Sequence, residues 1–136
     1  MAIANDPGII ISYDELRILL YNRGFRSCNG ILMPDRAMSD EEVLQTLNKL
    51  ALRGMIRAEE DHFVIEPETA RIVDLIGDPA GSYSFSDPET GQVYYCYISQ
   101  HLVIVSENYW KKKDTLRLRQ FTPAEFSIWR EELEGE

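Results

Sequence analysis

The residues best suited to recognition chemistry lie on one face of a predicted helix that spans residues 40–53. Amide side chains can read the edges of bases, and basic side chains can neutralise phosphates. The candidate nucleic-acid contacts on and just after this helix are Gln45, Asn48, Lys49, Arg53 and Arg57. The same residues could equally form the solvated face that any amphipathic helix has. The helix opens with three acidic residues at positions 40–42, which suit a helix N-terminus but would repel phosphates.

A second candidate set combines aromatic rings with basic charge. Tyr109, Trp110 and Lys111 lie in a predicted loop between two strands, where they could stack on bases or bind an acidic partner. Tyr95 and Tyr97 lie on a predicted strand, and tyrosine is enriched in protein interfaces. The alternatives are that the lysines keep a strand edge from pairing and that the tyrosines are ordinary strand residues.

Residues that could do covalent or acid–base chemistry are few and isolated. Cys28 and Cys96 have no neighbouring histidine, lysine or helix start that would activate a thiol. His62 and His101 belong to no motif, and the sequence contains no C-x-x-C pair, P-loop or nucleophile elbow. The sequence does not exclude a catalytic pair of carboxylates, but no motif singles out a pair among the 23 acidic residues. We therefore predict a protein that is not an enzyme and that uses no metal ion or cofactor.

The helices that must position these candidates begin at capping boxes, in which a hydroxyl residue is followed three residues later by glutamate. Such patterns start at Ser12, Ser39 and Thr122. Gly24 and Gly54 offer left-handed ends to the first two helices, and a further helix is predicted over 67–76. Residues 25–38 lack helical periodicity and are predicted as a loop with a short strand at 30–33.

Strand patterns dominate the second half of the chain. A hairpin is predicted over 55–65, directly after the long helix, and a first strand over 9–11. Four later strands fit an antiparallel meander, and they span 83–85, 93–98, 101–105 and 115–119. The sequence therefore predicts an α+β protein. It has a winged-helix-like segment over 1–78 and, packed with it as one unit, an antiparallel sheet plus a C-terminal helix over 79–136.

The composition indicates a folded but acidic chain. Its 136 residues are 44% hydrophobic, and the net charge is −9. Residues 1–78 hold 8 basic and 14 acidic residues, a balance of −6, and residues 79–136 hold 6 and 9, a balance of −3. Residues 1–78, which carry the candidate nucleic-acid contacts, are thus the more acidic part of the chain. This disfavours nucleic acid as a partner. The chain shows no secretion signal, no run of about 20 apolar residues and no disulfide framework, so we expect a cytoplasmic protein without a membrane span.

Residues 12–76 resemble the winged-helix superfamily. The resemblance rests on the helix before Gly24, on the end of the long helix at Leu47, Leu50 and Arg53-Gly54, and on the hairpin that follows. It implies a recognition helix with a wing, and hence a transcription regulator whose C-terminal sheet senses a signal or dimerises.

A second resemblance covers more of the chain. The order of the stretches 14–24, 42–54, 67–76 and 93–121 is similar to that of the EspG-like chaperones associated with type VII (ESX) secretion. Those proteins are built from two similar halves, and this chain is the length of one. The resemblance therefore implies a non-enzymatic adaptor or chaperone that forms a homodimer through a sheet edge or the closing helix. We prefer this protein-binding function, with Tyr95, Tyr97, Tyr109, Trp110 and Lys111 as contacts, and keep the DNA-binding regulator as the alternative.

Overall fold

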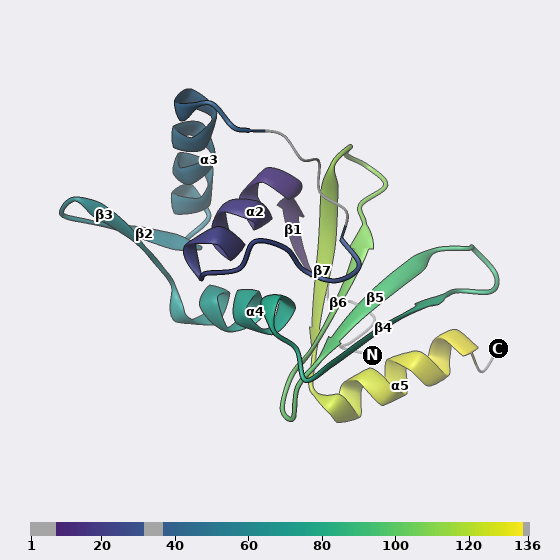
Figure 1. The fold of residues 1–136 in the computed structure, drawn as a ribbon. Helices are drawn as coiled ribbons and strands as arrows, with labels where there is room; N and C mark the ends of the chain where they lie inside the picture. Colours follow the sequence, from purple (N-terminus) through teal and green to yellow (C-terminus); the bar gives the residue numbers. More distant parts are fainter. Residues whose placement is uncertain (1–7, 32–36, 135–136) are drawn as a thin grey trace.

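The computed structural model describes residues 8–31 and 37–134, which form a mixed α+β fold that ends in a helix (Figure 1). The fold class predicted from the sequence is confirmed. The elements are β1 (Ile9–Ser12), α2 (Tyr13–Asn22), α3 (Asp40–Leu52), β2 (Ile56–Glu59), β3 (His62–Ile65), α4 (Pro67–Gly77), β4 (Gly81–Ser86), β5 (Val93–Ile98), β6 (Val103–Asn108), β7 (Thr115–Phe121) and α5 (Pro123–Glu134).

The main sheet has five antiparallel strands in the order β1-β7-β6-β5-β4. Strands β4 to β7 form the predicted meander. No pairing partner for the first strand is predicted from the sequence, and the structure pairs it with β7, so that Ile9 lies opposite Leu118. The sheet therefore contains residues from both sides of position 78. Strand β6 begins at Val103 rather than at His101, because Ser99 N–H donates to the Leu102 carbonyl in a turn (2.9 Å).

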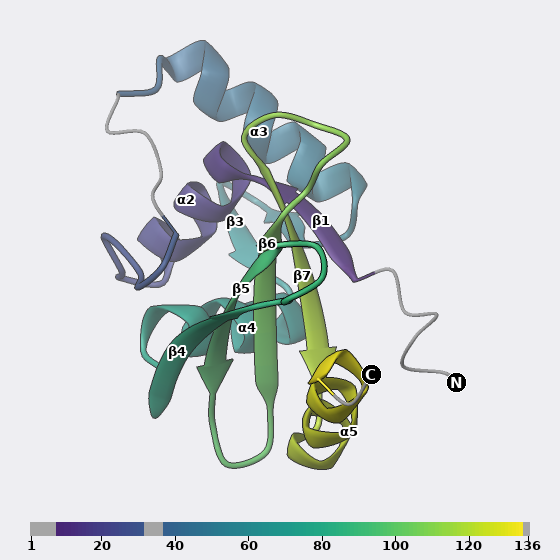
Figure 2. The same ribbon diagram turned by 90° about the vertical axis from the view of Figure 1, so that its right-hand side faces the viewer.

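The sheet separates two hydrophobic clusters, with α2 and α4 on one face and α5 on the other (Figures 1 and 2). On the first face, Leu16 of α2, Ile76 of α4 and Ile104 of β6 are fully buried. On the second face, Phe126 and Trp129 of α5 pack on aromatic residues of the sheet. Burying side chains of this size on both faces supplies the main driving force for folding.

Local signals in the sequence set the helix ends. All three predicted capping boxes form, since the hydroxyls of Ser12, Ser39 and Thr122 each accept from the backbone N–H three residues later. In each box the glutamate carboxylate accepts from the N–H of the capping residue in return. Gly24 and Gly54 have φ of +92° and +76°, the left-handed conformation that ends a helix and favours glycine.

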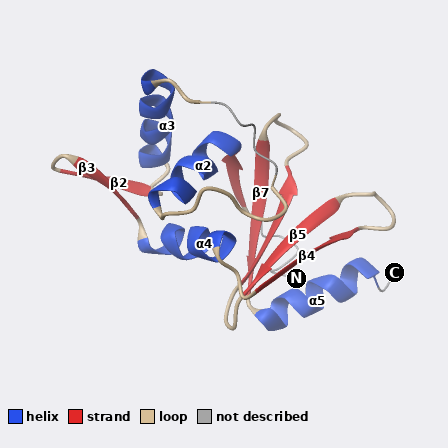
Figure 3. Ribbon diagram, viewed as in Figure 1, coloured by secondary structure: helices blue, strands red, loops and turns tan. Residues whose placement is uncertain are grey.

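Helix α3 runs directly into the two-stranded sheet β2–β3, separate from the main sheet (Figure 3). Within the described parts of the α2–α3 connection, residues 23–31 and 37–39, there is no helix. The short strand predicted at 30–33 is absent at its described residues 30–31, and the rest of it lies outside the described residues. At Gly30, φ is +82° and a Cβ atom would lie 2.1 Å from the Tyr95 ring, so this connection packs tightly against β5.

Candidate protein-binding surface

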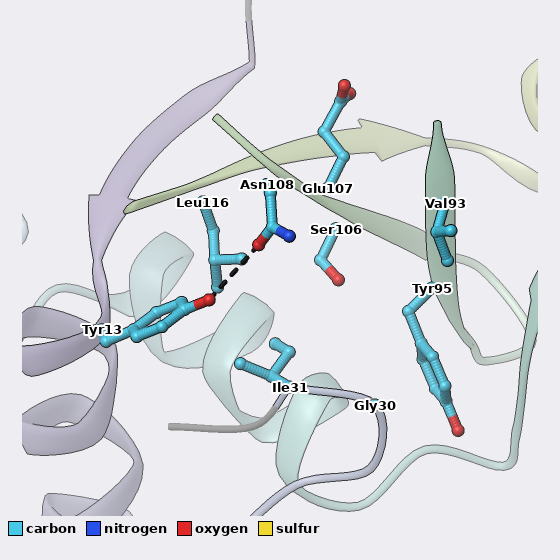
Figure 4. Close-up of a pocket in the computed structure, with 9 residues that line it drawn as sticks. All are labelled: Tyr13, Gly30, Ile31, Val93, Tyr95, Ser106, Glu107, Asn108 and Leu116. Carbon is cyan, nitrogen blue, oxygen red and sulfur yellow. Dashed lines mark hydrogen bonds between the residues drawn. The ribbon is translucent and has the colours of Figure 1, made fainter. Parts of the chain in front are cut away.

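The β6–β7 loop that carries Trp110 stands on a braced base. Tyr109 N–H donates to the Thr115 carbonyl (2.9 Å), which closes the loop, and Tyr13 N–H donates to the Asp114 carbonyl (3.0 Å). The Tyr13 hydroxyl also donates to Asn108 Oδ1 (3.3 Å), across a small pocket of about 190 Å³ (Figure 4). The start of α2 therefore holds both ends of the loop.

The tip of this loop presents an exposed indole. Trp110 is 78% exposed, and the Lys111 ammonium lies 5.1 Å from its ring centroid, within the range of a cation–π contact. Tyr109 beside it is half-buried. A large rigid ring held in water on a braced loop is the type of side chain that becomes an energetic anchor in protein interfaces.

The two tyrosines predicted as contacts on β5 lie elsewhere. Tyr97 is completely buried and its hydroxyl donates to the Asn29 carbonyl, so the prediction that it contacts a partner is wrong. Its neighbour Tyr95 is half-buried under the segment around Gly30, on the inner face of the sheet (Figure 4). The sequence pattern could not show that this strand lies inside the sheet, between β4 and β6, with a hydrophobic cluster on each face.

Arg53, at the end of α3, is occupied within the chain. Its Nη1 donates to both carboxylate oxygens of Glu15 (3.0 and 3.1 Å), and its Nη2 donates to the Ile10 carbonyl. Glu15 is itself 7% exposed and belongs to the capping box of α2. The guanidinium therefore joins α3 to the β1–α2 corner.

Arg57 is likewise paired with carboxylates of its own hairpin region. It donates to Glu59 (2.8 Å) and to Glu66 (2.5 Å). The Glu59 partner raises the pKa of Arg57, and the pKa of Glu59 is lowered in turn. Of the five candidate nucleic-acid contacts, the exposed side chains without such pairing are Gln45, Asn48 and Lys49.

The structure brings Lys49 to the Trp110 loop, although they belonged to two separate candidate sets. Lys49 lines a surface hollow of about 220 Å³ together with Lys112 and Lys113. An adjoining hollow of about 340 Å³ is lined by Lys49, Lys112 and Leu52, the last being 88% exposed. Leu52 is not among the candidate residues predicted from the sequence. The available signal was an apolar residue at the end of the helix, outside the stripe formed by Val43, Leu47 and Leu50.

A separate apolar groove of about 750 Å³ lies between α2, α3 and the hairpin. Tyr21, Leu47 and Phe63 are among its lining residues. Asp61 directly precedes the lining residue His62, Asp40 lies two residues after the lining residue Met38, and both aspartates are exposed. An apolar surface next to acidic groups is unsuited to a nucleic acid backbone.

The two thiols lie in surroundings that keep them protonated. Burial raises the pKa of Cys96 to about 12 and also raises the pKa of Cys28. His62 pairs with Asp61 on the exposed hairpin (3.1 Å). Among the described residues, no group of three or more His, Cys, Asp or Glu side chains is placed to hold a metal ion.

No protein-family model matches the chain, and no curated protein matches it. Within the described residues, every helix is too short or too polar to cross a membrane.

Proposed function

We propose that this protein is a non-enzymatic protein-binding module, an adaptor or secretion-type chaperone that acts as a homodimer. The observation that carries the proposal is Trp110, exposed by 78% at the tip of a loop whose base is tied to α2. Because hydrogen bonds hold both ends of the loop, a partner that covers the indole has less backbone to fix on binding.

The second subunit of the proposed homodimer fits best at the free edge of β4. This strand pairs with β5 on one side only, and its six residues, Gly81–Ser86, include no charged residue and no proline. Proteins usually protect such edges with lysine, proline or a bulge. Antiparallel pairing of two β4 strands would extend the sheet across a two-fold axis.

The alternative, a DNA-binding regulator, has less support in the geometry. Arg53 and Arg57, which would have bound phosphates, are held by Glu15, Glu59 and Glu66. Freeing Arg53 would leave the buried carboxylate of Glu15 without its partner, and that penalty opposes binding.

Two measurements test the proposed function. Light scattering should give a mass of 2 × 15.7 = 31.4 kDa for the homodimer. Ser84→Lys on β4 should shift this to 15.7 kDa, while Ser127→Lys on exposed α5 should not. If the wild-type protein has the mass of a monomer at micromolar concentration, the proposed homodimer is wrong.

Docking through the loop is tested separately. A photo-crosslinking residue at position 110 should give discrete adducts in cells, whereas the same residue at exposed Glu68 of α4 should give none. Equal adducts at both positions would count against the loop as a docking site.

A further inference from the structure

We infer that the docking site at Trp110 extends onto helix α3 and recognises an acidic protein segment that also carries apolar side chains. This inference rests on the proposed function and names the chemistry of the partner. Three observations support it: the lysines lie close together, the ion pairs within the protein are formed by arginines, and two large apolar side chains near the lysines are exposed.

The four lysines of the chain lie in two segments that the fold brings together. Three of them, at positions 111–113, follow Trp110 in the β6–β7 loop, and the fourth is Lys49 on α3, more than 60 residues earlier. Lys49, Lys112 and Lys113 line a common hollow. The folded chain therefore concentrates positive charge that its overall balance of −9 conceals.

This charge is available because the arginines, not the lysines, form the internal ion pairs. Arginine pairs within the described residues tie helices, hairpin and sheet, for example Arg23 with Asp74 (2.7 Å) and Arg119 with Glu107 (2.9 Å). No lysine forms an ion pair with another described residue. Arginine suits such fixed bidentate contacts, and the more hydrated lysine ammonium suits a surface that meets its partner from water.

Two large apolar side chains accompany the lysines. Leu52 is 88% exposed and lines the hollow that Lys49 and Lys112 share, and Trp110 directly precedes the lysine run. They are the two most exposed large apolar side chains among the described residues. A partner that satisfies this surface needs apolar groups as well as negative charge.

Acidic residues on the same surface favour a protein segment over a nucleic acid. Asp14, Glu15 and Asp114 also line the hollows. The first two pair with Arg17 (3.5 Å) and Arg53 (3.0 Å), so they do not neutralise the lysines. A continuous phosphate backbone would have to pass these carboxylates, whereas an acidic peptide can place its carboxylates at the lysines and its apolar residues at Leu52 and Trp110.

The test uses a fluorescein-labelled peptide of mixed glutamate and leucine, with a polyglutamate peptide and a single-stranded oligonucleotide of equal charge as comparisons. Anisotropy should show the mixed peptide binding most tightly, with an affinity that falls about tenfold from low to physiological salt. Trp110→Ala should weaken it about tenfold and Lys49→Ala about threefold. Arg71→Ala, which removes an equal charge from an exposed position on α4, should leave the affinity unchanged.

Each outcome decides one point. Tighter binding of the oligonucleotide, or equal binding of polyglutamate, overturns the assignment of an acidic and apolar segment. If Lys49→Ala behaves like Arg71→Ala while Trp110→Ala still weakens binding, the extension onto α3 is wrong. Crosslinks from position 110 in cells, combined with no binding of the mixed peptide, would leave the proposed function standing and overturn only this inference.

Discussion

Replacing Arg53 by alanine should destabilise the fold although the residue lies at an exposed helix end. The change removes two hydrogen bonds to Glu15 and one to the Ile10 carbonyl. The Glu15 side chain is only 9% exposed, so its carboxylate would keep just the capping contact from Ser12 N–H (2.8 Å). A charged group left in this position costs about 2 kcal/mol, less than a fully buried pair would, because the Arg53 side chain is 36% exposed.

Urea denaturation measures this loss in the free energy of unfolding. In thermal denaturation the melting temperature should fall by about 6–10 °C. Arg57→Ala is the matched control, because its partners are more exposed and the loss should be much smaller. Glu15→Gln combined with Arg53→Ala should show a coupling energy of at least about 1 kcal/mol. A loss for Arg53→Ala no larger than for Arg57→Ala, with no coupling, would refute the view that Arg53 is structural.

Three further predictions follow from the packing. Trp129→Ala should cost about 3–4 kcal/mol in urea denaturation because it empties the α5 cluster, whereas Trp110→Ala should stay within about 0.5 kcal/mol. Gly30→Ala should cost more than Gly24→Ala in the same assay: both have positive φ, but only the first would drive a Cβ into an aromatic ring. The Cys96 thiol has a raised pKa of about 12, so unfolded chains lose this proton first as pH rises, and stability should decline from about pH 9 upward. Cys96→Ala should reduce that decline in denaturation series at different pH.

Features determined by neighbours in the sequence could be predicted. The capping boxes at Ser12 and Ser39 require only a hydroxyl and a glutamate three residues apart, and both form. The helix ends at Gly24 and Gly54 depend on a backbone conformation that favours glycine. The strands of the meander follow each other along the chain, so their pairing could be predicted as well.

Features that depend on residues far apart in the sequence could not be predicted from it. The pairing of β1 with β7 joins segments about 100 residues apart, and no local pattern specifies it. The burial of Tyr97 depends on α4 and the segment around Asn29 covering β5, and the role of Arg53 depends on where Glu15 comes to lie. The exposed position of Leu52 could have been suspected, since it falls outside the apolar stripe of its helix.

The charge of the chain illustrates why total composition is a weak guide to partners. A balance of −9 disfavours any anionic ligand if the charges are spread evenly, but folding distributes them unevenly. Several arginines pair with a nearby carboxylate, whereas three of the four lysines line a common hollow between α3 and the loop that carries Trp110. At physiological salt, charges beyond about 8 Å are largely screened, so a short partner at this surface interacts mainly with the lysines and little with the distant acids. A long nucleic acid would extend into the acidic surroundings, and for this reason the same surface distinguishes between two classes of anion.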